Sequence, residues 1–259
     1  MRSSSAAEPT SVLADTYDGV TAVELARALS VPSVVLYEEI GSTLDAAHER
    51  AAEGAAAGTL VLADAQTAGR GRMGRSWTSQ RGSGVWLTLI ERPRDVAALE
   101  VLSIRVGLAI APALDAFAND MVRLKWPNDL YVGARKLAGI LVEARWRDAK
   151  PEWVSIGVGI NVRRPENEAK ACGLNEGVSR LEVLQAILPT LRSAALRHGG
   201  LTSDELEAFA VRDLARGREC VEPVGGVVQG IDSTGGLLID VGTQQVSVRT
   251  GSLVLKEES

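Results

Sequence analysis

Between Gln66 and Trp77 the chain carries a high density of arginine and glycine. Arg70, Arg72 and Arg75 alternate with glycines in a stretch without aspartate or glutamate, although the whole chain has a net charge of −5. The guanidinium group presents a planar set of donors that suits carboxylates and phosphates, and glycine lets a backbone approach a ligand closely. The stretch therefore predicts either a loop that closes over a multiply charged anion or a solvated basic loop that contacts nucleic acid.

Three other polar segments combine groups that could handle such an anion. Residues 41–43 read Gly-Ser-Thr and lie between a strand-like run and a helix-like run. Residues 125–129 read Lys-Trp-Pro-Asn-Asp and place a cation, an amide and a carboxylate around a rigid proline. Lys136 opens the third segment, which continues directly into an apolar strand. The ammonium group of Lys136 is therefore predicted to point into a site and not into solvent.

In this order and spacing, the four segments resemble biotin protein ligase, the enzyme that attaches biotin to carboxylase carrier domains. The resemblance is strong over residues 38–161 and weaker toward the C-terminus. It implies that the carboxylate of biotin attacks the α-phosphorus of ATP, giving biotinyl-5′-AMP and pyrophosphate. The ε-amine of a carrier lysine then displaces AMP. The implied ligands are ATP, Mg²⁺ and biotin, and the implied partner is the biotin carboxyl carrier protein of acetyl-CoA carboxylase or a related carboxylase.

The resemblance also implies roles for individual residues. Lys136 and Arg72 are implied to be catalytic, because cations near the biotin carboxylate and the departing pyrophosphate offset the repulsion between two anions. The implied biotin contacts are Ser42, Thr43, Gln66, Gly69, Arg70, Gly71, Arg72, Lys136 and Gly139. The implied ATP and adenylate contacts are Arg72, Arg75, Trp77, Lys125, Asn128, Asp129 and Asn161. No permanent metal site is expected, and Mg²⁺ would enter with ATP near Asp129.

Each segment also has a structural interpretation. Ser42 or Thr43 could cap the N-terminus of a helix, and the Pro-Asn-Asp sequence favours a turn. Trp77 could be an apolar lid over the ligand or a core tryptophan at the foot of the loop. Leu44 stands where the family commonly has asparagine, so an amide at the ureido ring of biotin is lost. We expect weaker biotin binding or compensation by a neighbouring residue.

The apolar pattern predicts an α+β fold. Strands are expected over residues 33–37, 59–63, 84–90, 122–125, 130–132, 136–144 and 153–160, and helices over 21–29, 43–53, 96–117, 179–197 and 203–210. A kink is expected at Pro112 in the longest helix. The elements indicate a mixed, mostly antiparallel sheet with helices on one side. The resemblance identifies this layout with the catalytic fold of class II aminoacyl-tRNA synthetases and biotin ligases.

Three regions are expected along the 259 residues: a flexible N-terminus over 1–18, a catalytic domain over 19–213 and a C-terminal domain over 214–259. Short alternating runs separated by glycine turns predict a small antiparallel barrel in the last region, and the resemblance implies an SH3-like one. Some family members carry an N-terminal winged helix-turn-helix. The segment before Ser33 is too short for this module, so DNA is not an expected partner.

Composition limits other classes of function. Cys172 and Cys220 have no metal-binding spacing and are expected to be inert thiols in a reducing cytosol. The sequence contains no secretory signal and no apolar run of membrane-spanning length, so a cytoplasmic protein without a membrane partner is expected. With His48 and His198 as the only histidines, neither a Ser-His-Asp triad nor a histidine-rich metal site is favoured.

Two alternative functions remain open. A lipoate ligase or octanoyl transferase shares the fold and acylates a lysine, but these relatives lack the Gly-Arg-Gly-Arg sequence. A non-enzymatic nucleic-acid-binding module would use the arginines directly. The acidic chain and the single aromatic residue of the loop argue against that second alternative.

Overall fold

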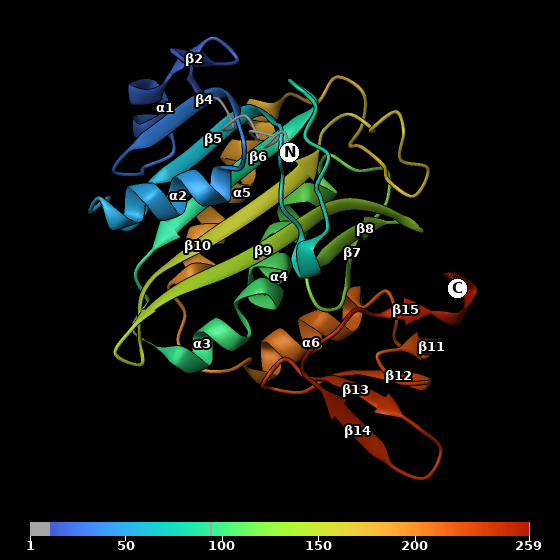
Figure 1. Ribbon diagram of the computed structural model, residues 1–259. Coiled ribbons are helices and arrows are strands. Elements are labelled where there is room, and N and C mark those ends of the chain that lie inside the picture. Colours follow the sequence, from blue (N-terminus) through green and yellow to red (C-terminus); the bar gives the residue numbers. More distant parts are fainter. Residues whose placement is uncertain (1–10, 94, 259) are drawn as a thin grey trace, which may run out of the picture.

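Two β-sheets organise the chain in the computed structural model, which describes residues 11–93 and 95–258 (Figure 1). The large sheet contains, in order across it, β1 (Val12–Leu13), β4 (Val34–Ile40), β5 (Leu60–Gln66), β6 (Gly84–Glu91), β10 (Lys150–Asn161), β9 (Arg135–Arg147), β8 (Asp129–Val132) and β7 (Val122–Lys125). Strands β4 and β5 pair in parallel, and the other neighbours are antiparallel. The predicted mixed, mostly antiparallel sheet is confirmed.

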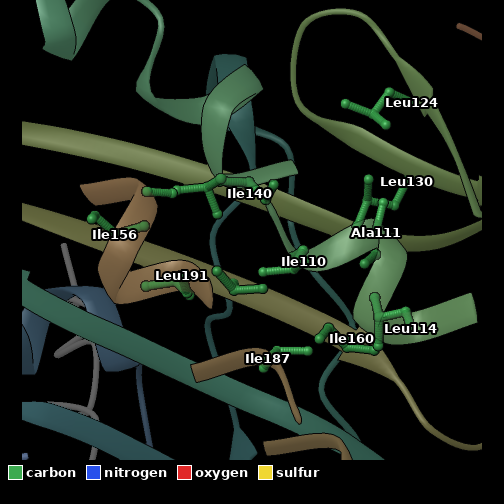
Figure 2. Close-up of a cluster of buried hydrophobic side chains, with 14 of the residues drawn as sticks. Ile110, Ala111, Leu114, Leu124, Leu130, Ile140, Ile156, Ile160, Ile187 and Leu191 are labelled. Atoms are coloured by element: carbon green, nitrogen blue, oxygen red, sulfur yellow. The ribbon is translucent and has the colours of Figure 1, made fainter. Parts of the chain in front are cut away.

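One face of this sheet is covered by α4 (Leu102–Asp115) and α5 (Arg180–Ala195). Figure 2 shows Ile110 and Leu114 of α4 together with Ile187 of α5, packed beside Ile156 and other strand residues. Every residue of β6 is buried, because both faces of the sheet are covered there. This packing forms the main hydrophobic core.

The opposite face of the sheet is covered by α2 (Thr43–Ala52), which lies across β5, β6 and β10 (Figure 1). Along β5 the side chains alternate: Leu62 belongs to the main core, whereas Val61 and Ala63 pack with Ala47 of α2. The expectation that helices lie on one side is therefore corrected. The small alanines of α2 allow the helix to approach the sheet closely, which the apolar pattern alone does not reveal.

The helix expected over residues 96–117 is two helices. α3 (Val96–Glu100) ends at Val101, a fully buried residue with φ −104° and ψ 1°, and α4 begins immediately after it. Pro112 lies inside α4. The predicted single helix is therefore interrupted at Val101, whereas α4 continues through Pro112 and the kink expected there stays a prediction.

The N-terminal residues that the structure describes are ordered against the sheet. β2 (Thr16–Tyr17) pairs with β3 (Val20–Thr21), and α1 (Ala22–Ala28) follows with the expected capping box between Thr21 and Glu24. The side chain of Tyr17 is 2% exposed. Of the region expected to be flexible, residues 1–10 lie outside the described residues, whereas residues 12–13 and 16–17 form two short strands.

A second sheet contains β14 (Gln245–Val248), β13 (Leu237–Asp240), β12 (Gly226–Ile231), β11 (Glu219–Glu222) and β15 (Val254–Leu255), in that order and all antiparallel. It lies beside α6 (Ser203–Arg212) (Figure 1). The amide of Leu214 donates to the carbonyl of Leu124 at 2.9 Å, and the indole of Trp126 donates to the carbonyl of Gly235 at 2.9 Å. The small sheet is thus anchored to β7 and to the turn that follows it.

A buried ion pair fixes the segment between α5 and α6. Arg105 of α4 is 2% exposed and donates to Glu205 of α6 at 2.7 Å. It also donates to the carbonyls of Gly199 and Gly200. Burial alone would raise the pKa of Glu205, but hydrogen bonds from Arg105 and from the Thr202 amide outweigh burial, so the pKa lies below its usual value. The carboxylate is therefore held in its charged form.

Candidate active site

A cleft of about 380 Å³ opens on the face of β6, β9 and β10. Residues 66–77, here called the arginine loop, leave the end of β5 and form one side of the cleft. The N-terminus of α2 closes one end, called the inner end. The β7–β8 turn and residues 252–254 of the small sheet border the other end, called the outer end.

The floor of the cleft requires glycine. Trp77, half-buried, lies over β9 and β10, and its ring meets Trp86 edge to face at 6.4 Å between centroids. A Cβ atom on Gly159 would lie 2.6 Å from Nε1 of Trp77, so no larger residue fits beneath the ring. Nε1 of Trp77 is buried and has no acceptor in the described part of the chain. Trp77 therefore forms a wall of the cleft, and its indole N–H is a hydrogen-bond donor without an acceptor among the described residues.

The inner end is a network of neutral polar groups. Ser42 is the N-cap of α2, and its hydroxyl accepts from the amide of Leu44 at 3.3 Å. The amide of Thr43 donates to Oε1 of Gln66 at 2.8 Å, and Nε2 of Gln66 donates to Ser79 at 2.7 Å. These contacts connect α2, β5 and the segment after Trp77, so they fix the polar groups of the inner end before any ligand arrives.

Leu44 and Thr88 complete the inner end. The hydroxyl of Thr88 donates to that of Thr43 at 2.9 Å. Leu44 is 3% exposed and lines the cleft, and a Cβ atom on Gly157 would lie 3.1 Å from its Cδ1. The inner end therefore joins hydroxyl and amide groups to one apolar wall.

The outer end carries charge. Lys136 lines the cleft, with Nζ 2.8 Å from Oδ1 of Asp129 and 5.1 Å from the centre of the Trp77 ring. Lys125 is 7% exposed and lies 5.4 Å from the Tyr131 ring. The carboxylate of Asp129 fixes the position of the Lys136 ammonium.

Asn128 links the turn to the sheet and to the arginine loop. Its Nδ2 donates to the carbonyl of Ile140 at 2.7 Å, and its Oδ1 accepts from Arg72 at 3.4 Å. Burial lowers the pKa of the Arg72 guanidinium, whereas Asp129 acts in the opposite direction. Arg72 is half-buried at the outer end, and its hydrogen-bond acceptors among the described residues are neutral oxygens.

The arginine loop also touches the small sheet. Arg72 donates to the carbonyl of Gly251 at 3.4 Å, and Arg75 donates to the hydroxyl of Ser252 at 2.5 Å. Met73 adopts a positive φ of 57° at the tip, where its side chain is 71% exposed. Residues 251–254, at the start of β15, thus form part of the site although they come from the far end of the sequence.

Arg70 differs from the other arginines of the loop. Its guanidinium pairs with Asp45 of α2 and with Glu143 of β9. Its two terminal nitrogens are therefore occupied by carboxylates.

Most of the residues singled out in the sequence come together at this cleft. The cleft lining includes Ser42, Thr43, Gln66, Arg70, Gly71, Arg72, Arg75, Trp77, Lys125, Asn128, Asp129, Lys136 and Gly139. Gly69 is buried behind the lining, where its carbonyl accepts from the amide of Trp77 at 2.7 Å. Asn161 is buried at the end of β10 opposite Gly84 and does not line the cleft, because Trp77 covers the strand before that point.

Sequence reasoning missed several lining residues. Thr88 interrupts the apolar run of β6, and Gly157 and Gly159 alternate on one face of β10, so both signals were present in the pattern. No sequence signal marked Ser252 or Lys170. The described residues contain no group of three His, Cys, Asp or Glu side chains that could hold a metal ion. Nor does any helix among them have the length and apolar character needed to cross a membrane.

Comparison with known proteins agrees with this geometry. The model of the biotin/lipoate A/B protein ligase family matches residues 39–161. The biotin–[acetyl-CoA-carboxylase] ligase of Mycobacterium tuberculosis is 34% identical, with 83% of this chain and 86% of that protein covered. The biotin protein ligase of Aquifex aeolicus in complex with biotin and ATP is similar in structure, with a TM-score of 0.71, 25% identity and coverage of 86% of this chain and 98% of that one.

The chain belongs to the biotin/lipoate A/B protein ligase family. The bifunctional ligase/repressor BirA of Bacillus subtilis is 37% identical over 60% of this chain and 51% of its own length. The chain spans about half the length of the first curated relatives that it matches.

Proposed function

We propose that this protein attaches biotin to a lysine of a biotin carboxyl carrier protein, using ATP and forming biotinyl-5′-AMP as the intermediate. The observation that carries the proposal is a single cleft with a neutral hydrogen-bonding end and a cationic end, joined beneath a glycine–arginine loop. Biotin has a neutral ureido ring and an anionic carboxylate at opposite ends of the molecule, so the polarity of the ligand matches that of the cleft.

The inner end would hold the ureido ring. Ser42, Thr43 and Gln66 supply hydroxyl, amide and carbonyl groups there, and Gly71 with the loop backbone would close over the ring. Thr88 supplies a hydroxyl where Leu44 offers no polar group, which supports compensation for the missing amide. Gly139 and Gly159 let the Trp77 ring lie close to the sheet, and Gly157 does the same for Leu44, so these two apolar side chains would flank the bicyclic ring.

The outer end would bring the biotin carboxylate and the α-phosphate of ATP together. A carboxylate oxygen attacks the α-phosphorus, and pyrophosphate leaves with the bonding electron pair. Lys136, oriented by Asp129, and Arg72 would offset the repulsion between the reactants and stabilise charge in the transition state. Lys125, Asn128 and Arg75 would contact the nucleotide, as would the buried donor of Trp77.

The second step would transfer the biotinyl group to the carrier lysine. The ε-amine of that lysine attacks the carbonyl carbon of the mixed anhydride, AMP leaves, and the amine loses a proton. The acyl-adenylate also reacts with water, so a loop that covers it favours transfer over hydrolysis.

Magnesium would enter with ATP. Asp129 is the carboxylate at the outer end, and Mg²⁺ commonly uses one or two carboxylates together with phosphate oxygens and water. Because Asp129 already contacts Lys136, most of the metal's ligands would be phosphate oxygens and water.

The finer assignments belong to the same proposal. The five-stranded small sheet would be an SH3-like domain, and the partner would be the carrier domain of acetyl-CoA carboxylase or a related carboxylase. The protein would act in the cytoplasm. The boundary between the two domains is proposed at residue 213, which precedes the contact between Leu214 and β7.

Mass spectrometry of a carrier domain incubated with the protein, biotin, ATP and Mg²⁺ tests this function. We expect one biotinyl group on the carrier lysine, and none on a carrier whose lysine is replaced by alanine. Lipoate or octanoate in place of biotin tests the alternative acyl ligase. Modification with lipoate but not biotin would overturn the proposal.

A further inference from the structure

Arg70 of the arginine loop lies in a cluster of charged residues from α2 and β9. One terminal nitrogen of its guanidinium donates to Oδ1 of Asp45 at 2.5 Å, and the other donates to Oε1 of Glu143. Asp45 lies in the first turn of α2, and Glu143 lies on β9. The loop is therefore pinned by its first arginine to two elements that form the walls of the cleft.

Glu143 is itself held in place by His48. The indole of Trp153 donates to Nδ1 of His48 at 2.9 Å. Because an indole N–H only donates, Nδ1 accepts, and the ring proton of the neutral histidine lies on Nε2. Nε2 faces the second carboxylate oxygen of Glu143 at 3.1 Å. Glu143 thus accepts from His48 with one oxygen and from Arg70 with the other.

We propose that Arg70 is a positioning residue that holds the arginine loop closed, and that Asp45, Glu143 and His48 form the latch that receives it. The proposal rests on the function proposed above, since it concerns retention of biotin and biotinyl-5′-AMP in this cleft. Arg70 then acts through the loop, and its guanidinium does not bind the ligand anion.

The contrast with Arg72 supports this division of roles. The hydrogen-bond acceptors of Arg72 among the described residues are neutral oxygens of Asn128 and Gly251, both at 3.4 Å, and Asp129 acts on its charge without a direct ion pair, so the charge of Arg72 is less closely matched than that of Arg70. The charge of Arg70 is already matched by two carboxylates. A ligand anion would have to displace at least one of them, and its approach would be opposed by both negative charges.

The position of the latch explains how it couples to the ligand. Asp45 follows Thr43 and Leu44, which line the inner end, and His48 lies one turn further along the same helix. The glycine-rich loop has a large conformational entropy when free, so a tether near its start restricts the residues that follow. Closing the latch therefore brings Gly71 and Arg72 to the cleft.

A double-mutant cycle between Arg70 and Glu143 tests the proposal. The variants are Arg70→Ala, Glu143→Gln and the double variant, with Glu49→Gln as a matched control on an exposed position of α2. The probe is a non-hydrolysable biotinyl-adenylate analogue, and the readouts are its dissociation rate and hydrogen exchange of residues 69–75 in the complex. Thermal unfolding of each variant reports any general loss of structure.

We expect Glu143→Gln to speed dissociation about fivefold, as for the loss of one partly exposed ion pair, and to speed exchange in the loop. The double variant should be no faster than Arg70→Ala alone, because both changes open the same latch. Arg70→Lys, which can reach one carboxylate, should give an intermediate rate.

Additive effects, or a wild-type rate in Glu143→Gln, would overturn the latch. So would a much larger effect of Arg70→Ala than of Glu143→Gln combined with Asp45→Asn, since this result would place Arg70 on the ligand. Failure of the wild type to catalyse biotin-dependent ATP–pyrophosphate exchange would instead reject the proposed function. The two failures are therefore distinguishable.

Discussion

The inner and outer ends of the cleft hold their polar groups in different ways. At the inner end, Thr43, Gln66 and Thr88 are neutral and satisfy one another through hydrogen bonds between neighbouring elements. At the outer end, Lys136 and Arg72 are charged, and they come from segments that meet only in the folded protein. Under the proposed function, one end would select a ligand by shape and hydrogen bonding, while the other would stabilise charge during the reaction.

This division has an energetic basis. Neutral hydrogen bonds are directional, and a mismatched ligand leaves buried groups unpaired at a cost of about 1–3 kcal/mol. Charges in a partly buried site act more strongly, and they favour whichever state develops complementary charge. Changes at the inner end should therefore alter binding, and changes at the outer end should alter the rate.

Lys136→Ala should produce the largest loss of activity and should affect the outer end of the cleft alone. Loss of one cation at the reacting centre should reduce adenylate formation about 10²–10³-fold while the protein folds normally. Biotin-dependent exchange of pyrophosphate into ATP measures this rate, with Lys150→Ala, on an exposed part of β10, as control. A rate within about twofold of the wild type would remove Lys136 from the reaction.

Glu205→Gln should lower stability without distinguishing the two ends. Removing one partner of the buried pair leaves Arg105 uncompensated and should cost about 3 kcal/mol in the free energy of unfolding at neutral pH. The pKa of Glu205 is lowered in the folded state, so its stabilisation is complete above the usual glutamate pKa and is lost as pH falls through the folded value. The difference between variant and wild type should shrink in acid.

Urea unfolding across a pH series measures this difference, with the exposed residue change Glu207→Gln on the same helix as control. If the difference in unfolding free energy between variant and wild type stays constant as the pH falls, the charge of Glu205 does not contribute to stability.

Thr43→Val should affect binding at the inner end without affecting the outer end. The hydroxyl of Thr43 joins Gln66 to Thr88, so its loss should raise the KM for biotin about tenfold with little change in kcat. Steady-state kinetics at varied biotin concentration separates the two constants. Thr190→Val, whose hydroxyl bonds within α5, serves as control. A fall in kcat with an unchanged KM would contradict the division of roles.

Arg75→Ala should give the smallest effect. Arg75 is exposed and its contact with Ser252 is open to solvent, so we expect about a threefold rise in the KM for ATP. The same kinetic assay at varied ATP concentration measures it. An effect as large as that of Lys136→Ala would place Arg75 among the reacting charges.

Local chemistry made parts of this structure predictable. The two partners of the capping box, Thr21 and Glu24, are only three positions apart, so a short stretch of sequence contains both. The four polar segments located most of the cleft because their side chains are polar in otherwise apolar surroundings. The interruption at Val101 was not predictable, since no glycine or proline marks it in the sequence.

Contacts between residues far apart in the sequence limited what could be predicted. Arg70 and Arg72 look alike in sequence. They differ in the structure because Arg70 contacts Asp45 and Glu143, which are 25 and 73 residues away along the chain. The placement of α2 opposite α4 and α5, and the contribution of residues 252–254 to the cleft, likewise depend on contacts between distant segments.

The hydrogen bond between Trp126 and Gly235 has a consequence for exchanging the small sheet between relatives. Trp126 belongs to the same short motif as Lys125 and Asn128. The motif that borders the cleft therefore also contacts the small sheet. A chimera that takes its small sheet from a relative would need a β12–β13 turn that places a carbonyl where Trp126 can donate to it. Without that carbonyl, the foreign sheet would lose one of the contacts that hold residues 252–254 in the wall of the cleft.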